Sequence, residues 1–427
     1  MNNSRRNNSG ITLIALVITI IVLLILAGVS VATLTGNNGI LTRANEARTQ
    51  TEEAEDIEKI RLAISEAQIG ENGYQELNFH SFQKALNSQF GEDNAIASIS
   101  EDGTYAVSCF DTLKDYAVSG NVIKEIRDWN EKMASARVPE EQTNKNVIGI
   151  GTDGNPVNMD LWKYTLNDKK GGYDLNSEEA INNGERIAGY RGSVKEDGTI
   201  EGTVPQYIKE NNGKWLPVTS LSGTFQGHDE TSNRELTKLT TAPKIPPTVK
   251  SMKTTFEYCE NLTNITCIPG SVTELRWTFD GYTGLEKMPQ IGYGVEDMTG
   301  VFSGCSELKK LTVLPDTVKN IQYAFMYCSS LQDLPNIPES VTNMNQTFSN
   351  CKGLKYIEIT ISENVTNIQQ TFAECTNLEG IITINCNPEN YENFLQNTTK
   401  PITLKGKSTM LNQIANAGRS DVTVVEE

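Results

Sequence analysis

Three patterns of hydrophobic and polar positions follow one another along the chain, and the first is an apolar run over residues 9–34. No charged residue lies between Arg6 and Arg43. Ile11–Leu34 spans 24 residues, and a helix of that length extends about 36 Å, which exceeds the roughly 30 Å of a hydrocarbon core. Because the remaining sequence is too polar to surround such a helix, residues 11–34 are predicted to span a membrane once.

The second pattern is amphipathic and covers residues 44–68. Small and apolar residues recur at three- and four-residue steps, which places them on one helix face. This face consists of Ala47, Gln50, Ala54, Ile57, Ile60, Ile64 and Ala67, and the opposite, solvated face of Glu52, Glu53, Glu55, Asp56, Glu58, Lys59 and Arg61. Gly36 and Gly39 weaken the helix before this segment. Whether they mark a functional break or a simple helix end stays open.

Residues 71–137 predict a small α/β domain, in which a helix lies across an antiparallel sheet. Phe79, Phe82, Leu86 and Phe90 share one helix face, and alternating segments between residues 101 and 129 predict the strands. We expect Cys109 to be a small buried strand residue. His80 is expected at the surface or the helix start, since its neighbours do not have the spacing of metal ligands.

Residues 138–217 form a predicted β-rich connector that caps the domain after it. Its aromatic anchors are Trp162, Tyr164, Tyr173, Tyr190 and Trp215. The sequence GIGTDG at residues 149–154 resembles a phosphate-binding loop only superficially, because no Gly-Lys-Ser/Thr follows it and Asn155-Pro156 does not open a helix. Asp153 and Asp160 lack the ligand series of an EF-hand. A tight turn between two strands is the better interpretation.

The third pattern is a repeat with a period of about 23 residues. Phenylalanines occur with spacings of 31, 23, 23, 23, 23 and 24 residues, at positions 225, 256, 279, 302, 325, 348 and 372. Each Phe has a valine seven residues earlier and a large aliphatic residue four residues earlier. A leucine follows six residues later in all but the first unit, and another aliphatic residue three positions after that. One such unit cannot bury its apolar face alone, so the repeat predicts a stacked solenoid.

Five of the eight cysteines occupy one column of this repeat, three residues after the Phe: Cys259, Cys305, Cys328, Cys351 and Cys375. An inward-facing column suits free cysteine, a small hydrophobe with a weak S–H donor. Equivalent residues of neighbouring coils lie about 4.8 Å apart, whereas a disulfide requires Cβ atoms about 3.8 Å apart. We therefore predict a ladder of free thiols, with disulfides or metal as the alternative. His228 holds this position in the first unit and is expected at the surface.

The segment after the repeats predicts a C-terminal cap over residues 386–427. Residues 387–396 predict a short helix, residues 402–406 a strand, and residues 408–418 a helix capped by Ser408 and ended by Gly418. The tail predicts a final strand or a frayed end. The domain boundaries are thus 1–10, 11–70, 71–137, 138–217, 218–385 and 386–427.

Composition and charge restrict the function. The net charge of −17 argues against nucleic acid or anionic lipid as the main partner. With only two histidines, the chain has little material for His-based catalysis or a His-rich metal site. No nucleophile lies beside a base in the sequence, so we expect a binding or structural protein without catalytic, metal or cofactor residues.

The start of the chain resembles the prepilin processing site of type IV pilins and pseudopilins. A short leader with Arg5 and Arg6 precedes Gly10, which is followed by Ile11, Thr12, Leu13 and Ile14. The resemblance implies cleavage between Gly10 and Ile11 by a prepilin peptidase, N-methylation of Ile11, and packing of the helix with other pilin-like subunits. The glutamate usual at the fifth mature position is Ala15 here, which weakens the case for filament assembly.

Two other interpretations of the apolar run stay open. The sequence AGVSVA at residues 27–32 is compatible with a signal-peptide cleavage site. The run is also compatible with a plain anchor that never polymerises. The basic leader predicts that the N-terminus stays cytoplasmic and that the remaining chain faces outward.

Residues 218–384 resemble the leucine-rich repeats of BspA-like bacterial surface proteins. The overall expectation is an α+β protein: a long membrane or pilin-like helix with a small sheet-containing head, then a solenoid of about seven 23-residue units. The resemblances imply a cell-membrane or pilus-associated surface protein whose solenoid binds an extracellular protein or glycan. The alternative is a pseudopilin-like component of a secretion system. The exposed register positions proposed for recognition include Lys309, Lys310, Asp333, Lys355 and Glu358.

Overall fold

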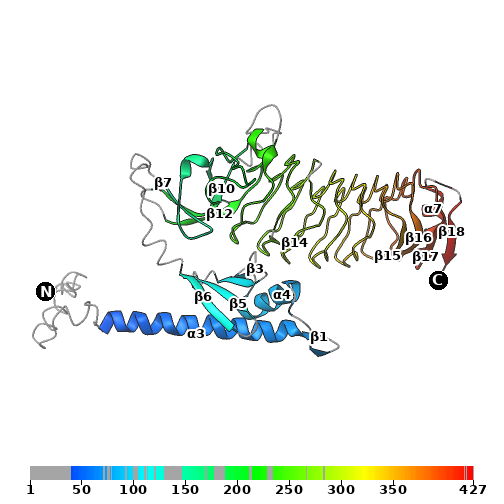
Figure 1. Ribbon diagram of the computed structural model, residues 1–427. Coiled ribbons are helices and arrows are strands. Elements are labelled where there is room, and N and C mark those ends of the chain that lie inside the picture. Colours follow the sequence, from blue (N-terminus) through cyan, green and yellow to red (C-terminus); the bar gives the residue numbers. More distant parts are fainter. Residues whose placement is uncertain are drawn as a thin grey trace, which may run out of the picture. The chain divides into compact units, whose positions relative to one another are not determined.

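The computed structural model gives the secondary structure of most of the chain after residue 39 (Figure 1). It describes residues 40–70, 73–74, 77, 79–91, 94–99, 104–109, 112, 114–119, 122–128, 147–167, 169, 171–176, 188–210, 214–227, 234–265, 267–281, 284–417, 419 and 421–426. Internal contacts divide the chain into two compact units, Met1–Lys59 and Ile60–Glu427. The apolar run of residues 9–34 and the Gly36–Gly39 segment lie outside the described residues.

Helix α3 extends over Ile40–Gln68 and ends where the amphipathic pattern ends. Ile60, Ile64 and Ala67 are buried, as expected from the pattern. The pattern was wrong at two positions, because Ala54 is exposed and Asp56 is buried. Asp56 precedes Ile60 by four residues, so it lies on the same face of the helix as the buried side chains.

The α/β domain is built on a four-stranded antiparallel sheet in the order β3-β4-β5-β6. Its elements are α4 (Phe79–Phe90), β3 (Ala95–Ile99), β4 (Tyr105–Cys109), β5 (Lys114–Ser119) and β6 (Val122–Asp128), preceded by the short pair β1 (Ile69–Gly70) and β2 (Gly73–Tyr74). The sequence pattern predicted helix α4 and the later strands but not β3. Cys109 is buried in its strand, as predicted.

Helix α4 is fixed to the first strand by one buried side chain, Gln83. Its Nε2 donates to the carbonyl of Ala95 at 2.9 Å, and its Oε1 accepts from the amide of Ala97 at 2.6 Å. Phe82 packs beside Gln83, and its ring meets the Tyr105 ring edge-on at 5.5 Å. The buried amide therefore satisfies two backbone groups of an edge strand that would otherwise have no partner on that side.

The connector contains a six-stranded sheet in the order β8-β7-β11-β12-β10-β9. These strands are β7 (Val147–Gly151), β8 (Pro156–Val157), β9 (Thr165–Asn167), β10 (Gly172–Asp174), β11 (Pro205–Glu210) and β12 (Leu216–Ser220), with the 3-10 helices η2 (Met159–Leu161) and η3 (Arg234–Lys238). GIGTDG forms the tight turn between β7 and β8, as predicted. The Gly154 amide donates to the Gly151 carbonyl at 2.9 Å, and Gly154 has a φ of +78°.

The connector shares its core with the first coil of the solenoid. The buried Trp162 ring lies 5.0 Å from the Tyr190 ring and 5.9 Å from the ring of Phe225, the first phenylalanine of the repeat. Tyr190 in turn donates its hydroxyl to the Glu201 carbonyl at 2.9 Å. The repeat core therefore ends against aromatic side chains rather than against solvent, which is what a capping unit requires.

The coils of the solenoid follow one another along its length (Figure 1), and their phenylalanines form a continuous stack inside it. Neighbouring ring centroids, from Phe225 to Phe372, are 5.3 to 5.8 Å apart, with interplanar angles of 3° to 16°. All seven rings are fully buried, as are the valine and leucine columns beside them. Parallel rings at this spacing add to the free energy gained from burial. The predicted solenoid of about seven turns is confirmed.

Polar side chains inside the coils bond to the coil before their own. We call the stacked phenylalanine of each coil its ladder Phe. In four coils the threonine just before the ladder Phe donates its hydroxyl to a carbonyl of the preceding coil, as Thr255 does to Leu221 at 3.0 Å and Thr347 to Ile321 at 2.9 Å. In the first coil Thr224 donates to the Leu175 carbonyl of the connector at 2.8 Å. In the remaining two coils Val301 and Ala324 hold this position, which removes the polar group altogether. Either solution leaves no hydroxyl of this column unpaired in the core.

The thiol column is present as predicted. All eight cysteines are free and buried. Within the column each Sγ donates to the carbonyl of the ladder Phe one coil earlier, at 3.0 to 3.3 Å. The thiols therefore act as small hydrophobic residues that also satisfy a buried backbone acceptor.

The solenoid continues beyond the boundary predicted at residue 385. Residues 387–396 form no helix; they make another coil, and the Phe372 amide donates to the Phe394 carbonyl at 3.0 Å. In every other coil, the amide of the ladder Phe donates to the carbonyl of the residue just before the ladder Phe of the next coil. Phe394 is therefore the residue before the repeat position, and Leu395 holds the position itself. The predicted helix was wrong. The next repeat position lies 23 residues after Phe372 and is a leucine, so a pattern defined by phenylalanine misses this coil.

Strands are well formed in the last coils. Parallel strands β15 (Tyr356–Ile361), β16 (Glu379–Ile384), β17 (Ile402–Gly406) and β18 (Thr423–Glu426) form one sheet, and helix α7 (Leu411–Asn416) covers its end. Earlier coils carry only the short pair β13 (Cys267–Ile268) and β14 (Gln290–Ile291) and single bridges. The predicted strand at 402–406 and the final strand are present. The helix between them is shorter than the predicted 408–418, and its N-cap is Met410 without a side-chain hydrogen bond, so the expected cap by Ser408 was wrong.

Candidate functional site

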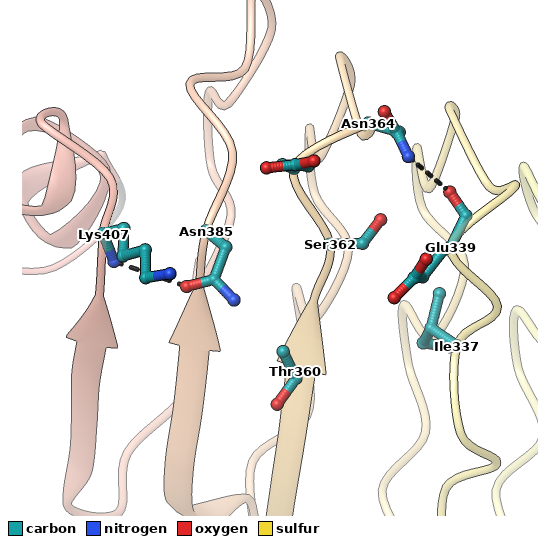
Figure 2. Close-up of a pocket in the computed structure, with 8 residues that line it drawn as sticks. Ile337, Glu339, Thr360, Ser362, Asn364, Asn385 and Lys407 are labelled. Atoms are coloured by element: carbon teal, nitrogen blue, oxygen red, sulfur yellow. Dashed lines mark hydrogen bonds between the residues drawn. The ribbon is translucent and has the colours of Figure 1, made fainter.

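The candidate site is a pocket at the carboxyl ends of β15, β16 and β17, where the chain leaves each strand (Figure 2). Its volume is about 390 Å³, which lies within the range of ligand-binding pockets. The lining side chains come from successive coils: Ile337, Glu339, Thr360, Ser362, Glu363, Asn364, Asn385 and Lys407. Parallel strands in register bring these residues together, because each coil adds its own turn at the same edge.

The pocket is polar, with two carboxylates, one ammonium group, two amides and two hydroxyls around a single aliphatic side chain. Asn364 Nδ2 donates to the Glu339 carbonyl at 2.9 Å, which fixes one wall, and the Lys407 amide donates to Asn385 Oδ1 at 3.4 Å (Figure 2). The Ser362 hydroxyl is buried and has no partner among the described residues. Such a lining suits a small polar ligand rather than an apolar one.

The sequence pattern did not identify this pocket. Glu339 and Ser362 both lie fourteen residues after a ladder Phe, and Ile337 and Thr360 twelve residues after one. The columns defined above end at the ninth residue after the Phe, although the twelfth is also mostly aliphatic, as at Ile291, Leu314 and Ile337. Counting the same columns onward would have placed these side chains at one edge of the solenoid.

The five positions proposed for recognition are exposed, as expected from the repeat register: Lys309, Lys310, Asp333, Lys355 and Glu358. They do not lie in the pocket. Lys309 forms an ion pair with Glu286 of the preceding coil at 3.3 Å, an exposed contact that contributes little to stability. The same holds for Lys319 and Glu296, which are 2.8 Å apart.

The remaining predicted positions contribute no described site. Gly10 and Ile11 lie outside the described residues, and so do the side chains of His80 and His228. Within the described part of the chain, no helix is long and apolar enough to cross a membrane. The same part holds no group of three or more histidine, cysteine, aspartate or glutamate side chains that could bind a metal ion.

The thiols are chemically quiet. Burial raises the pKa of Cys375 to about 12 and that of Cys386 to about 11. Burial likewise raises the pKa of Cys328 and Cys351 well above the usual value. Because the thiolate is the nucleophile and metal ligand, these cysteines are unreactive near neutral pH in the folded protein.

The fold defines a leucine-rich-repeat solenoid, and the comparison with protein families agrees with it. The family model described as "BspA type Leucine rich repeat region" matches residues 235–323 and 298–400, with six copies. Residues 235–400 are therefore a BspA-type leucine-rich repeat region. The match extends past residue 385, as the coil around Leu395 does.

One solved structure is similar to part of the chain. It is a leucine-rich repeat protein from Bacteroides ovatus ATCC 8483, with 20% sequence identity and a TM-score of 0.29. The likeness covers 62% of this chain and 75% of that one. No curated protein matches the sequence.

Proposed function

We propose that the protein is an outward-facing, membrane-anchored surface protein whose leucine-rich solenoid binds an extracellular ligand and so mediates adhesion. The observation that carries this proposal is the contrast between the columns of each coil. The buried columns repeat the same residue types, whereas exposed positions and the pocket at the ends of β15–β17 differ from coil to coil. Stacked repeats of this kind offer extended binding surfaces without a catalytic centre.

The test is a binding screen with the full-length protein in a non-glycosidic detergent. Arrays of bacterial and host surface proteins and of glycans would be probed, and bound targets would be tested again with Glu339→Gln and with exchanges at Lys310 and Lys355. Saturable binding that these exchanges weaken supports the proposal. A protein that binds no extracellular molecule on any array contradicts it.

The N-terminal segment is proposed to be the anchor, processed between Gly10 and Ile11 by a prepilin peptidase and methylated on Ile11. The motif of basic leader, Gly10 and aliphatic run supports this proposal. Mass spectrometry of the native N-terminus tests it. A methylated Ile11 is the expected result, whereas an intact Met1 or a new N-terminus near residue 33 would refute processing at this site.

Assembly is a separate question, on which Ala15 bears directly. Because the glutamate usual at that position is absent, a surface anchor that does not polymerise is favoured over a pilus subunit. A pseudopilin-like part of a secretion system, with the solenoid holding cargo, is the second candidate. Cross-linking on intact cells distinguishes them: isolated monomers are expected for an anchor, and ladders with other pilin-like proteins for an assembled subunit.

A further inference from the structure

Two residues of most coils adopt the left-handed backbone conformation, two positions before and two positions after the ladder Phe. Glycine, asparagine and glutamine hold several of these positions, as at Gly300 and Gln346. Four of them are aromatic, with φ values of +60°, +54°, +59° and +62°: Tyr258, Trp277, Tyr323 and Tyr327. We call these four residues the aromatic strip.

Bulky side chains are unusual in this conformation and cost on the order of 1 kcal/mol each relative to an unstrained residue. Gly300 and Gly304 occupy the equivalent positions of one coil and avoid this strain. The rings are also not part of the buried core, since Tyr327 is 50% exposed and the other three are partly exposed. Retaining strained aromatic residues at the surface points to a use for their exposed rings.

The Trp277 ring lies against the coil that follows it. A Cβ placed on Gly300 would lie 2.2 to 2.5 Å from three atoms of the Trp277 indole, so the face of this indole covers the glycine of the next coil. One coil further, the Tyr323 ring stacks on Trp277 with a centroid distance of 5.8 Å and an angle of 26°. Three successive coils therefore share one continuous aromatic surface.

Tyr258 repeats this arrangement in the second left-handed column. Its ring covers Gly281, where a Cβ would meet the ring at 2.4 Å. Gly281 has a φ of +94°, which glycine adopts without strain, and its missing side chain leaves room for the Tyr258 ring. The pairing of a ring in one coil with a glycine in the next thus occurs twice, in two separate columns.

Neutral amides lie beside Tyr323, whereas Arg276, next to Trp277, is charged and pairs with Glu274 and Asp297. The Tyr323 amide donates to the Asn345 carbonyl at 2.9 Å, which places Asn345 in the coil next to that ring. Asn345 is 9% exposed, and its Oδ1 has no donor among the described residues. Gln322 precedes Tyr323 in the same coil, and Gln346 holds the position of Tyr323 in the next coil. Amides offer both donors and acceptors and match hydroxyl groups well.

We propose that the aromatic strip, centred on Trp277 and Tyr323, binds a neutral glycan chain. The partly negative ring faces attract the C–H faces of pyranose rings, and the neighbouring amides bind their hydroxyl groups. The net charge of −17 disfavours a polyanionic chain at this surface. The inference rests on the proposed extracellular binding function and names its ligand class and contact residues.

The test measures binding of defined hexasaccharides to the full-length protein by calorimetry, in a non-glycosidic detergent. The probes are β-1,4-linked glucose, xylose and mannose hexasaccharides and β-1,3-linked glucose, with hexagalacturonate as the acidic comparison. The variants are Trp277→Gly and Tyr323→Gly, because glycine adopts a positive φ without strain and is native to this column at Gly300. Tyr356→Thr, which alters a 62% exposed tyrosine on strand β15, is the matched control.

We expect at least one neutral hexasaccharide to bind, and each glycine variant to weaken that binding roughly tenfold, as for loss of one stacked ring. The control should bind as the wild type does, and hexagalacturonate should bind more weakly. Saturation-transfer NMR on the wild type provides a readout that needs no variant. When the aromatic protons of the protein are irradiated, their saturation should pass to the C–H protons of the bound sugar.

Two results would overturn the inference: no neutral hexasaccharide binds, or the glycine variants bind it as the wild type does. A protein ligand captured on the arrays, with binding insensitive to Trp277→Gly, would also overturn it while leaving the proposed surface function intact. Failure of the proposed surface function would give a different result: the protein would bind no extracellular molecule on any array.

Discussion

Each coil of the solenoid contributes one buried ring and, in most coils, one buried thiol, and both act across the boundary to the neighbouring coil. Phe302 stacks between Phe279 and Phe325, with centroid distances of 5.3 and 5.8 Å. Cys328 Sγ donates to the Phe302 carbonyl at 3.2 Å. The stability of one coil therefore depends on side chains of the next, as is typical of repeat proteins.

Replacing Phe302 with alanine removes the middle of the ring stack and leaves a cavity that rigid neighbours cannot fill. We expect the free energy of unfolding to fall by about 3–5 kcal/mol, measured by guanidinium chloride titration followed by circular dichroism. Tyr356→Thr, at an exposed strand position, should change it by less than about 0.5 kcal/mol. Equal effects of the two substitutions would show that the stack does not carry the stability.

The buried thiols make stability depend on pH in the alkaline range. Burial raises the pKa of Cys375 from 9.0 to about 12, so between these two values the unfolded chain loses the thiol proton while the folded chain keeps it. The stability contributed by the neutral thiol is therefore complete below the lower value and falls by about 1.4 kcal/mol per pH unit above it.

The substitution Cys375→Ala isolates this effect from other groups that titrate in the same range. Denaturant titrations at pH 8 and pH 10 should show a smaller loss of stability in the variant than in the wild type, by about one thiol's contribution. The same loss in both proteins would mean that this thiol is not shielded in the folded state.

At the scale of elements, the α/β domain is joined by the contact of helix α4 with strand β3. The helix was predictable from the apolar spacing of Phe82 and Leu86. The strand was not, because AIASI lacks the polar alternation of a half-exposed strand, and its first three residues are all buried. The sequence feature that indicated a neighbouring backbone segment was Gln83, a polar residue on the buried side of its helix.

Replacing Gln83 with leucine keeps the volume but leaves the Ala97 amide and the Ala95 carbonyl without this partner. A buried unpaired group costs roughly 1–3 kcal/mol, so the variant should unfold at lower denaturant concentration, and the β3 amides should exchange hydrogen faster. Gln89→Leu is the control, since Gln89 makes an exposed bond to Glu66. Unchanged exchange at Ala97 would contradict the assigned contact.

At the scale of the whole molecule, the repeat register determines where the solenoid ends. The core columns and the thiol ladder were predictable, because burial restricts them to a few residue types. The last coil was not, since Leu395 holds the Phe position and Thr398 the cysteine position. The pocket and the aromatic strip were missed because their side chains face outward, where packing imposes no common residue type.

Truncation at residue 385, the boundary predicted from the sequence, tests where the solenoid ends. The shortened chain would expose Phe372 and strand β16, because the coil with Leu395 and strand β17 would be missing. We expect it to aggregate or to form oligomers in light scattering coupled to size-exclusion chromatography. A truncated chain as monomeric and as stable as the intact one would show that the cap begins where the sequence first suggested.

The central claim is that the solenoid faces outward from the cell, and protease treatment of intact cells tests it most directly. Mass spectrometry of the released peptides should find sequences from residues 218–406, while peptides of a cytoplasmic marker protein stay absent. Recovery of the solenoid peptides only after the cells are lysed would contradict the claim.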